Sequence, residues 1–246
     1  MNFLVQSKEP RTLTEISKNL CISASTTYRI MSSMKIANWA IQDPVTKKYN
    51  IGASLLQLAI SLTSKIDLRS AAQPYLRMLY HKVDEGVMLT VRIGLERMYV
   101  EQIESRHEVR QVADIGTRLP LWAGAPGKAI LAYLEEHDLE TVLTGIRSGE
   151  DDSLASQKSI NVKELRRQLG MIRKQGYAFS SSERIKGVSS VAAPIFDRDN
   201  VVIGAISVGG PEPTFTKGKA ISQGPLVKET AKQISLLLGF RIQERS

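Results

Sequence analysis

Side chains with a chemistry that suits DNA gather between Ser23 and Arg29. Ser25 and Thr26 carry short hydroxyls, Tyr28 a phenol and Arg29 a guanidinium, with no acid among them. A guanidinium can donate two hydrogen bonds to guanine, and hydroxyls can bond phosphate oxygens or base edges. A merely solvated helix face, the alternative, would normally show Glu and Lys at i,i+4 spacing. We therefore predict DNA contacts from Ser23, Ser25, Thr26, Tyr28 and Arg29.

A second basic feature follows closely. Residues 39–42 are β-prone, residues 43–46 have the turn-prone sequence DPVT, and residues 47–52 are KKYNIG, a pattern typical of a hairpin. Lys47 and Lys48 are expected near the hairpin tip, where they can reach backbone phosphates. Two lysines that only solvate a turn are the alternative. A hairpin directly after a DNA-contacting helix is a wing.

Two helices are needed to hold these side chains. Thr12 and Glu15 have the spacing of a capping box, which starts a helix at Leu13. That helix is expected to end near Cys21, because Ser23 can cap the next one. Two short helices joined by a tight turn place the second in a major groove. Its inward face is expected to consist of Ala24, Thr27, Ile30, Met31 and Met34.

Length and charge agree with a DNA-binding protein of two domains. The 246 residues exceed the usual size of one domain. Of the net charge of +8, residues 1–66 contribute +5, from eight Lys and Arg against three Asp and Glu. A basic segment attracts a polyanion, although many proteins that bind no nucleic acid also carry surplus lysine. Without a run of eighteen apolar residues or a secretory signal, we expect a cytoplasmic protein with no membrane role.

The rest of the chain predicts an α/β domain after a connecting helix at 53–66. A helix is expected at 70–83, followed by an antiparallel meander of strands at 87–93, 97–104 and 108–115. Helices follow at 124–134, 135–143 and 162–175, then strands at 176–180, 188–197 and 201–210. Pro225 is expected to break or kink whatever precedes the last helical tract, which carries Val227 and Leu238. One central sheet covered by helices accommodates all of these elements.

Residues for catalysis or for holding a cofactor or metal are not arranged in any recognisable pattern. The segment 124–129, GAPGKA, is not a phosphate loop, because Ala129 follows Lys128 where a Walker motif needs Ser or Thr. The three histidines are far apart, and the lone Cys21, expected to be buried, has no partner for a disulfide or zinc site. We expect neither cofactor nor metal. An enzyme, or a ligand-binding module with no DNA role, is the alternative class, and a scaffold is disfavoured by the small residues of the late strands.

Motifs along nearly the whole chain carry a family resemblance. LTEISKNLCISASTTYRIMSSM with a wing ending YNIG resembles the DNA-binding half of IclR-family regulators. GTRLPLWAGAPGKAILAYL, GYAFSSSERIKGVSSVAAPIFDRDNVVIGAISVGGP and ETAKQISLLLGF are similar to that family's C-terminal signatures, in the same order. Two departures are Cys21 and Ser17, where the family usually has Gly and Ala. Only Asn2 to Gln6 are available for the family's first helix.

The resemblance implies a domain layout and a function. It implies a winged helix-turn-helix in residues 1–52, a linker helix in 53–69 and a GAF-like mixed α/β effector-binding domain in 70–246. It also implies a protein that usually acts as a repressor of a catabolic operon. Because one recognition helix reads only a few base pairs, we expect a homodimer or homotetramer on double-stranded operator DNA.

The resemblance also implies an effector site in the C-terminal domain, for a small organic acid or an aromatic compound. Relatives that hold very small keto acids often have Asp at the position of Ser180 and Cys at that of Ser190. The implied lining residues are Leu121, Trp122, Gly124, Ala125, Ser180, Val188, Ser190, Ser207 and Gly209.

Overall fold

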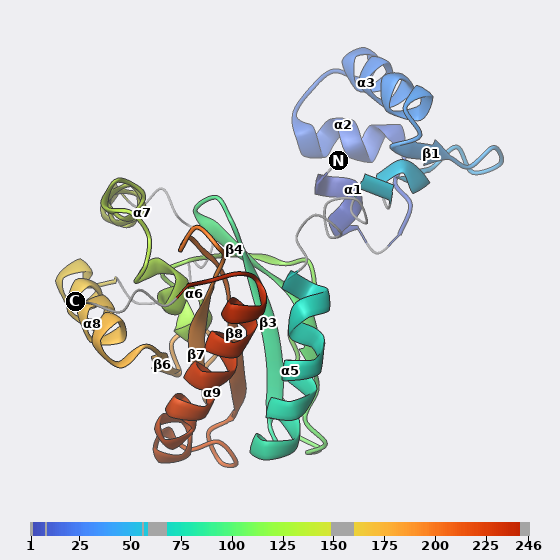
Figure 1. Cartoon of the computed structure of the whole chain (residues 1–246). Coiled ribbons are helices and arrows are strands. Elements are labelled where there is room, and N and C mark those ends of the chain that lie inside the picture. The colour runs from blue at the N-terminus through green and yellow to red at the C-terminus, as the bar shows by residue number, and fades with distance from the viewer. Residues whose placement is uncertain (1, 8, 56, 59–67, 149–159, 242–246) are drawn as a thin grey trace. The chain divides into compact units, whose positions relative to one another are not determined.

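The computed structural model of the chain describes residues 2–7, 9–55, 57–58, 68–148 and 160–241. The chain divides into two compact units, Met1–Ile66 and Asp67–Ser246 (Figure 1). Among the described residues, no helix combines the length and apolar character needed to cross a bilayer.

The first unit is a helix-turn-helix followed by a hairpin, as expected. Its helices are α1 (Asn2–Gln6), α2 (Leu13–Leu20) and α3 (Ala24–Ile36). Strands β1 (Ala40–Gln42) and β2 (Tyr49–Ile51) pair antiparallel, with Ile41 opposite Asn50. Each element contributes to a small core, and packing of these few side chains sets the direction of α3. The core consists of Leu4, Ile16, Met31, Ala40 and Tyr49.

The turn between α2 and α3 differs from expectation at Cys21. The capping box is present, with Thr12 and Glu15 bonding each other's backbone N–H. Cys21 adopts a left-handed conformation with φ of 53° and its side chain is exposed, so the prediction of a buried cysteine is wrong. The physical reason is that Cys21 ends α2, where its N–H bonds the carbonyl of Lys18 and its side chain has no core to enter.

The inward face of α3 is narrower than expected. Thr27 and Met31 are buried and Met34 is half-buried, whereas Ala24 is exposed and Ile30 is 39% exposed. Ile30 lies with Leu20 at the edge of an apolar groove between α1, α2 and α3, which stays open to solvent. Because α2 has only eight residues, it cannot cover the whole of α3.

The expected linker helix is described only in its first part. Residues 53–55 and 57–58 are helical, and the remainder of the expected helix, through residue 66, lies outside the described residues. The next helix, α5 (Leu68–Val83), begins two residues before the expected position at Ser70.

The second unit is built on a six-stranded antiparallel sheet with the strand order β5-β4-β3-β8-β7-β6. Because β3 pairs with the much later β8, the sheet joins an early and a late part of the chain. The strands are β3 (Gly86–Ile93), β4 (Glu96–Ile103), β5 (Arg118–Pro120), β6 (Ala178–Ser181), β7 (Val188–Phe196) and β8 (Val202–Pro211).

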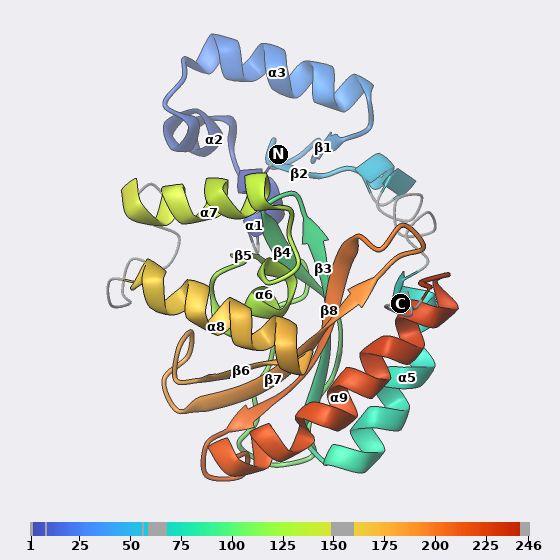
Figure 2. The ribbon, with the colours of Figure 1, turned by 60° about the vertical axis from the view of Figure 1, so that its left-hand side comes forward.

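Helices cover both faces of this sheet (Figure 2). On one face α5 and α9 (Lys217–Leu237) pack side by side over β3, β7 and β8. On the other face α6 (Gly124–Leu131) lies against β6, β7 and β8, and α8 (Val162–Gln175) packs on α6. The remaining helix, α7 (Glu136–Ser148), contacts α8 and runs past its expected end at residue 143. A separate apolar core fills each side of the sheet.

The expected third strand of the meander, at 108–115, is wrong. This segment is irregular, and the strand that pairs with β4 is the three-residue β5. The side chain of Gln102 takes the place of a strand ladder, because its amide donates to the carbonyl of Gln111 and accepts from the N–H of Ala113. The apolar residues that suggested a strand, Val109, Val112 and Ile115, are exposed.

Pro225 does not break the last helix, so the first of the two expected effects, a break or a kink, is wrong. The helix α9 runs through it from Lys217, with Thr216 as its N-cap accepting from the N–H of Lys219. Ala220 before the proline and Val227 after it are both fully buried in the core beneath α9. Packing on both sides of Pro225 therefore offsets the hydrogen bond that proline cannot make.

Candidate functional sites

The outer face of α3 presents the predicted DNA-contacting side chains to solvent. Ser25, Thr26, Tyr28 and Arg29 are all exposed, Tyr28 by 59%. No carboxylate of the described residues lies within ion-pair distance of Arg29, so its guanidinium keeps its donors for a partner. Ser23 has an additional structural part, because its Oγ accepts from the N–H of Thr26 at 3.1 Å and caps the helix.

The hairpin tip is ordered by one aspartate. Asp43 Oδ1 accepts hydrogen bonds from the N–H groups of Val45 and Thr46 and from the Thr46 hydroxyl. The bonds from Thr46 come first among the interactions that hold the pKa of Asp43 below its ordinary value. Lys47, exposed with a φ of 58°, and the half-buried Lys48 follow this turn. The hairpin thus presents two ammonium groups beyond a fixed turn.

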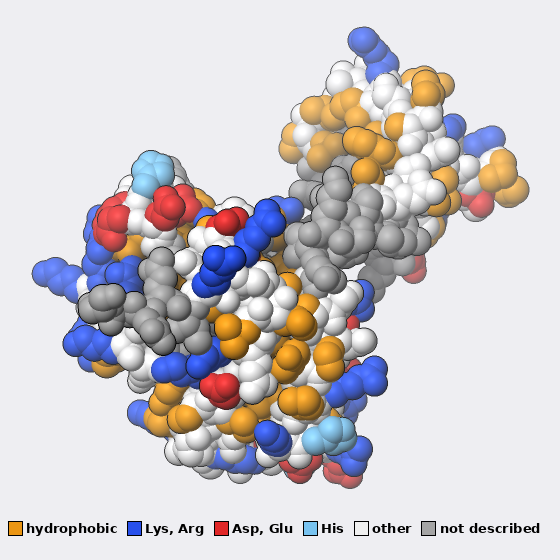
Figure 3. Space-filling view, viewed as in Figure 1, with side chains coloured by type: hydrophobic (Ala, Val, Ile, Leu, Met, Phe, Trp, Pro, Cys, Tyr) orange, Lys and Arg blue, Asp and Glu red, His pale blue; other side chains and the backbone are white. Residues whose placement is uncertain are grey.

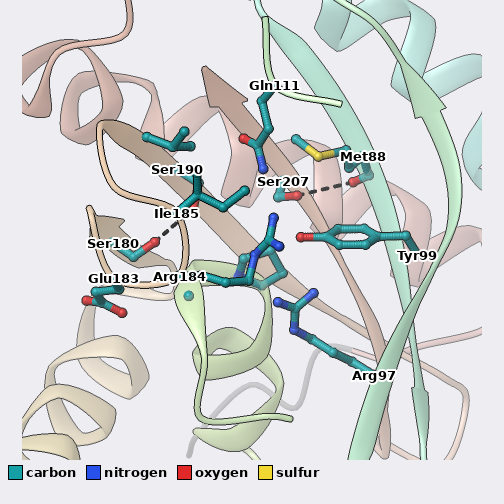
Figure 4. Close-up of a pocket in the computed structure, with 13 residues that line it drawn as sticks. Met88, Arg97, Tyr99, Gln111, Ser180, Glu183, Arg184, Ile185, Ser190 and Ser207 are labelled. Atoms are coloured by element: carbon teal, nitrogen blue, oxygen red, sulfur yellow. Dashed lines mark hydrogen bonds between the residues drawn. The ribbon is translucent and has the colours of Figure 1, made fainter. Parts of the chain in front are cut away.

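A pocket in the second unit lies between the sheet and the N-terminus of α6, and the segment joining β6 to β7 borders it (Figure 4). Its volume is about 20 Å³, which is room for about one water molecule. The lining residues come from six segments far apart in the sequence. They are Met88, Arg97, Tyr99, Gln111, Gly124, Pro126, Ser180, Glu183, Arg184, Ile185, Val188, Ser190 and Ser207.

Five of the nine expected effector-site residues line this pocket: Gly124, Ser180, Val188, Ser190 and Ser207. The other four do not line it. Leu121 and Ala125 are fully buried in the core around α6, and Trp122 packs at the edge of that core. Gly209 lies opposite Ser190 in the register of β7 and β8. Contact of any of the nine with an effector stays a prediction.

Three serine hydroxyls give one side of the pocket a neutral polar surface. Ser180 Oγ accepts from the N–H of Ala125 at 2.9 Å and lies 2.9 Å from Ser190 Oγ. Ser207 Oγ donates to the carbonyl of Met88 at 3.5 Å. The bond between Ser180 and Ala125 ties β6 to the first turn of α6, so the strand and the helix start are held together.

Arg97 is the residue that sequence reasoning missed. It lies on β4, is 0% exposed, and places its guanidinium 5.0 Å from the centre of the Tyr99 ring. Burial lowers the pKa of Arg97 from its ordinary value; Tyr99 opposes this shift and the charge of Arg184 adds to it. A signal was available, because Arg97 and Tyr99 are two residues apart on a strand and their side chains therefore lie on the same face of the sheet.

Lys128, in the GAPGKA segment, is tied up within the protein. Its side chain is only 3% exposed, and Nζ donates to Glu183 Oε1 at 2.6 Å and to Gln168 Oε1 at 3.1 Å. This lysine therefore joins α6 to α8 and to the segment after β6. In the part of the chain that the structure describes, no cluster of His, Cys, Asp and Glu could hold a metal ion.

Comparisons with known proteins decide the family. Residues 60–236 match the family model described as "Bacterial transcriptional regulator IclR C-terminal". The HTH-type transcriptional repressor AllR of Escherichia coli K12 is 31% identical over 243 residues, which cover 98% of this chain and 88% of AllR. The chain belongs to the IclR family of transcriptional regulators. The AllR of Salmonella typhimurium is 32% identical over the same length.

Solved IclR structures share the fold. The Thermotoga maritima IclR has a TM-score of 0.70 and 27% identity, covering 97% of this chain and 95% of its own. An IclR homologue from Microbacterium hydrocarbonoxydans, solved as a complex with 4-hydroxybenzoate, has a TM-score of 0.74 and 23% identity, covering 95% and 93%. These relatives confirm the expected fold class, and the AllR match confirms a regulator of transcription rather than an enzyme. Membership of the family implies binding of DNA and of a small-molecule effector.

Proposed function

We propose that the chain is a repressor that binds a palindromic operator as a homodimer or homotetramer and is controlled by a small organic acid or aromatic effector. In this proposal residues 1–52 bind DNA, residues 53–69 link the domains, and residues 70–246 bind the effector. The protein acts in the cytoplasm, on a catabolic operon. Oligomerisation follows from the small reach of one recognition helix, which contacts too few base pairs to find one site in a genome.

The observation that carries the DNA-binding part is the outer face of α3. It combines Arg29, exposed hydroxyls and Tyr28 without an acidic neighbour. In this arrangement Arg29 specifies a base, and Ser25, Thr26 and Tyr28 bond phosphates or base edges. Lys47 and Lys48 at the hairpin contact the backbone and add affinity for any sequence.

A mobility-shift titration on the promoter fragment tests this division of labour. Arg29→Ala should weaken cognate binding by about 1–3 kcal/mol and relax the base preference. Lys47→Ala and Lys48→Ala should weaken cognate and unrelated DNA alike, because they remove contacts to phosphate. Lys232→Ala, an exposed substitution on α9 with the same change in charge, is the control. If Arg29→Ala binds the promoter as tightly as the parent chain, α3 is not the recognition helix.

The effector part of the proposal is supported by the pocket beside α6. Its serines and Gly124 coincide with positions that the family resemblance implies. The 4-hydroxybenzoate held by the Microbacterium relative is both an acid and an aromatic compound, so it belongs to the chemical classes proposed here. Binding should stabilise the chain by about 2.7 kcal/mol at a hundredfold excess of ligand over Kd. A thermal-shift screen of organic acids and aromatic catabolites tests it, and turnover of a hit would contradict it.

A further inference from the structure

The pocket contains a buried cation whose hydrogen bonds are mostly unmade. Of the three guanidinium nitrogens of Arg97, only Nη2 has a partner, the carbonyl of Ala123 at 3.0 Å. Nε and Nη1 are buried and meet hydrogen-bond geometry with no group of the described residues. No carboxylate of that part of the chain lies within ion-pair distance of Arg97. A buried charge without a counter-ion is costly, so such an arrangement persists only where something compensates it.

Apart from the ring of Tyr99 and the carbonyl of Ala123, the surroundings of Arg97 add positive charge. The guanidinium lies against the first turn of α6, since a Cβ added at Gly127 would be 3.0 Å from Nε and one at Gly124 would be 4.0 Å from Nη2. That end of a helix carries partial positive charge. Figure 4 shows Arg184 from the β6–β7 segment also directed toward the middle of the pocket.

Glu183, the acid among the described residues that line the pocket, does not neutralise Arg97. Glu183 already accepts from Lys128 at 2.6 Å, on the far side of the pocket from β4 (Figure 4). Among the described lining residues, Arg97 therefore lies beside a helix N-terminus without a carboxylate of its own, because Glu183 is held by Lys128. The charges around this pocket therefore favour binding of an anion.

We propose that Arg97 binds the acidic group, a carboxylate or a phosphate, of an anionic effector, and that it is the residue that selects charge in this pocket. The inference rests on the proposed function, because it takes the pocket to be the effector site. Nη1 and Nε have N–H groups for the acid. The hydroxyl of Tyr99 and the amide of Gln111 point into the pocket, where they can contact the rest of the ligand (Figure 4). The cavity of about 20 Å³ has room for about one water molecule, so binding of an acid requires the exposed Ile185 to move.

A purely structural arginine is the competing explanation. Arg97 could serve only to hold Ala123 and to pack on Tyr99. The two explanations predict opposite effects of Arg97→Met, which keeps the length of the side chain and removes the charge. Loss of an uncompensated charge should leave the Tm of the ligand-free chain unchanged or raise it, because an apolar side chain suits the buried site. Loss of a structural contact should lower it.

The test uses the full chain with probe ligands in matched pairs. Acetate, benzoate and 4-hydroxybenzoate are each compared with the corresponding amide, and inorganic phosphate is compared with chloride at equal ionic strength, by thermal shift and calorimetry. At least one anion should raise the Tm of the parent chain while its neutral or chloride counterpart does not. Arg97→Met should lower the affinity for that anion by about 10- to 100-fold, which is the usual contribution of a charge-assisted hydrogen bond. The carboxylate and phosphate arms distinguish the two acidic groups.

Arg118→Met is the matched control, because Arg118 is exposed on β5 and pairs with Glu96. It should bind the anion as the parent does. The inference is wrong if acids and amides act equally, if Arg97→Met binds the acid as tightly as the parent, or if no anion raises the Tm of the parent.

A separate mobility-shift readout keeps this inference apart from the proposed function. If an acid binds through Arg97 but leaves operator affinity unchanged, the proposal that this pocket controls operator binding is wrong, whereas the proposal of an anion site at Arg97 is retained. If a neutral compound shifts operator affinity equally in the parent and in Arg97→Met, the proposal of control by an effector is retained, and the proposal that Arg97 selects anions is wrong.

Discussion

Arg29 and Arg97 show how differently the two units of this chain expose their chemistry. Arg29 stands on an exposed helix face, where its charge is solvated until a partner arrives. Arg97 is 0% exposed beneath α6, so its charge is costly unless a ligand compensates it. The first arrangement follows from which residues follow one another along a helix. The second exists only after β4, α6 and the segment after β6 have come together.

The two units also differ in what holds them together. Among its described residues the first has a core of five buried apolar side chains, and it depends strongly on helix caps and on close backbone packing. The second has two large cores, one on each face of its sheet. Local changes should therefore affect the first unit through its caps and turns, and the second through the contacts between distant elements.

The largest effect is expected from Gly52→Ala in the first unit. A Cβ at Gly52 would lie 2.1 Å from the carbonyl oxygen of Asn38, and backbone cannot move aside as a flexible side chain can. We expect a loss of stability at the upper end of about 1–3 kcal/mol, with operator binding lost as well. Thermal melts and mobility shifts measure both. If the variant keeps both the operator binding and the Tm of the parent, the end of the hairpin tolerates a side chain that its geometry should exclude.

Gly127→Ala is the corresponding change in the second unit. The new Cβ would lie 2.4 Å from the carbonyl oxygen of Leu121 and 3.0 Å from Arg97 Nε. The cost of about 1–3 kcal/mol should be reduced by the gain of about 1 kcal/mol that alanine brings to a helix. Anion binding should weaken too, because α6 and Arg97 are displaced together.

Gly170→Ala provides the control for this prediction. Gly170 lies within α8, and a Cβ there would have no heavy atom within 4 Å. Only the helix preference of alanine acts at this position, so the chain should become more stable by about 0.5–1 kcal/mol. Chemical denaturation distinguishes the two variants by the sign of the change. The same sign for both would contradict the close approach of α6 to the segment at Leu121.

Local signals in the sequence were enough for the first unit. Thr12, Glu15 and Ser23 mark helix starts through bonds to N–H groups within three residues, so their effect does not depend on the rest of the fold. The errors were in exposure. Cys21 and Ile30 were expected to be buried, but a helix end and a short neighbouring helix leave both open to solvent.

Long-range contacts explain what the sequence could not predict in the second unit. The alternation at 108–115 favoured a strand, but the side chain of Gln102 takes the hydrogen bonds of that segment. Arginine is usually a surface residue. The burial of Arg97 requires contact with α6, which lies about thirty residues later in the sequence. The family resemblance pointed to five of the pocket's lining residues but not to the cation that dominates its charge.

A smaller effect should separate the cap at Ser23 from its expected DNA contact. Ser23→Ala removes the acceptor for the N–H of Thr26 and should cost about 1 kcal/mol of stability. Ser23→Asp keeps a capping oxygen, so stability should be retained while its charge repels phosphate and weakens DNA binding. Thr12→Ala is the matched cap variant on α2. If Ser23→Asp and Ser23→Ala weaken DNA binding only in proportion to their Tm, Ser23 is a cap alone.

The smallest effect concerns a carboxylate on the exposed surface of α8, in contrast to the buried charge of Arg97. Glu164 accepts from Arg167 at 2.6 and 2.7 Å and from Gln168 at 3.1 Å. The bonds from Arg167, followed by the bond from Gln168, lower the pKa of Glu164 from 4.5 to about 2. Because the folded-state pKa is depressed, the stabilisation is complete above pH 4.5 and is lost as the pH falls through about 2.

Glu164→Gln should therefore melt slightly below the parent at pH 7, and the melting temperatures of the two proteins should converge as the pH falls from 4.5 toward 2. Glu229→Gln on α9 controls for the change in net charge. A difference for Glu164→Gln that stays constant across that interval would mean that the carboxylate makes no favourable contact, and that solvent screening cancels the pairing with Arg167.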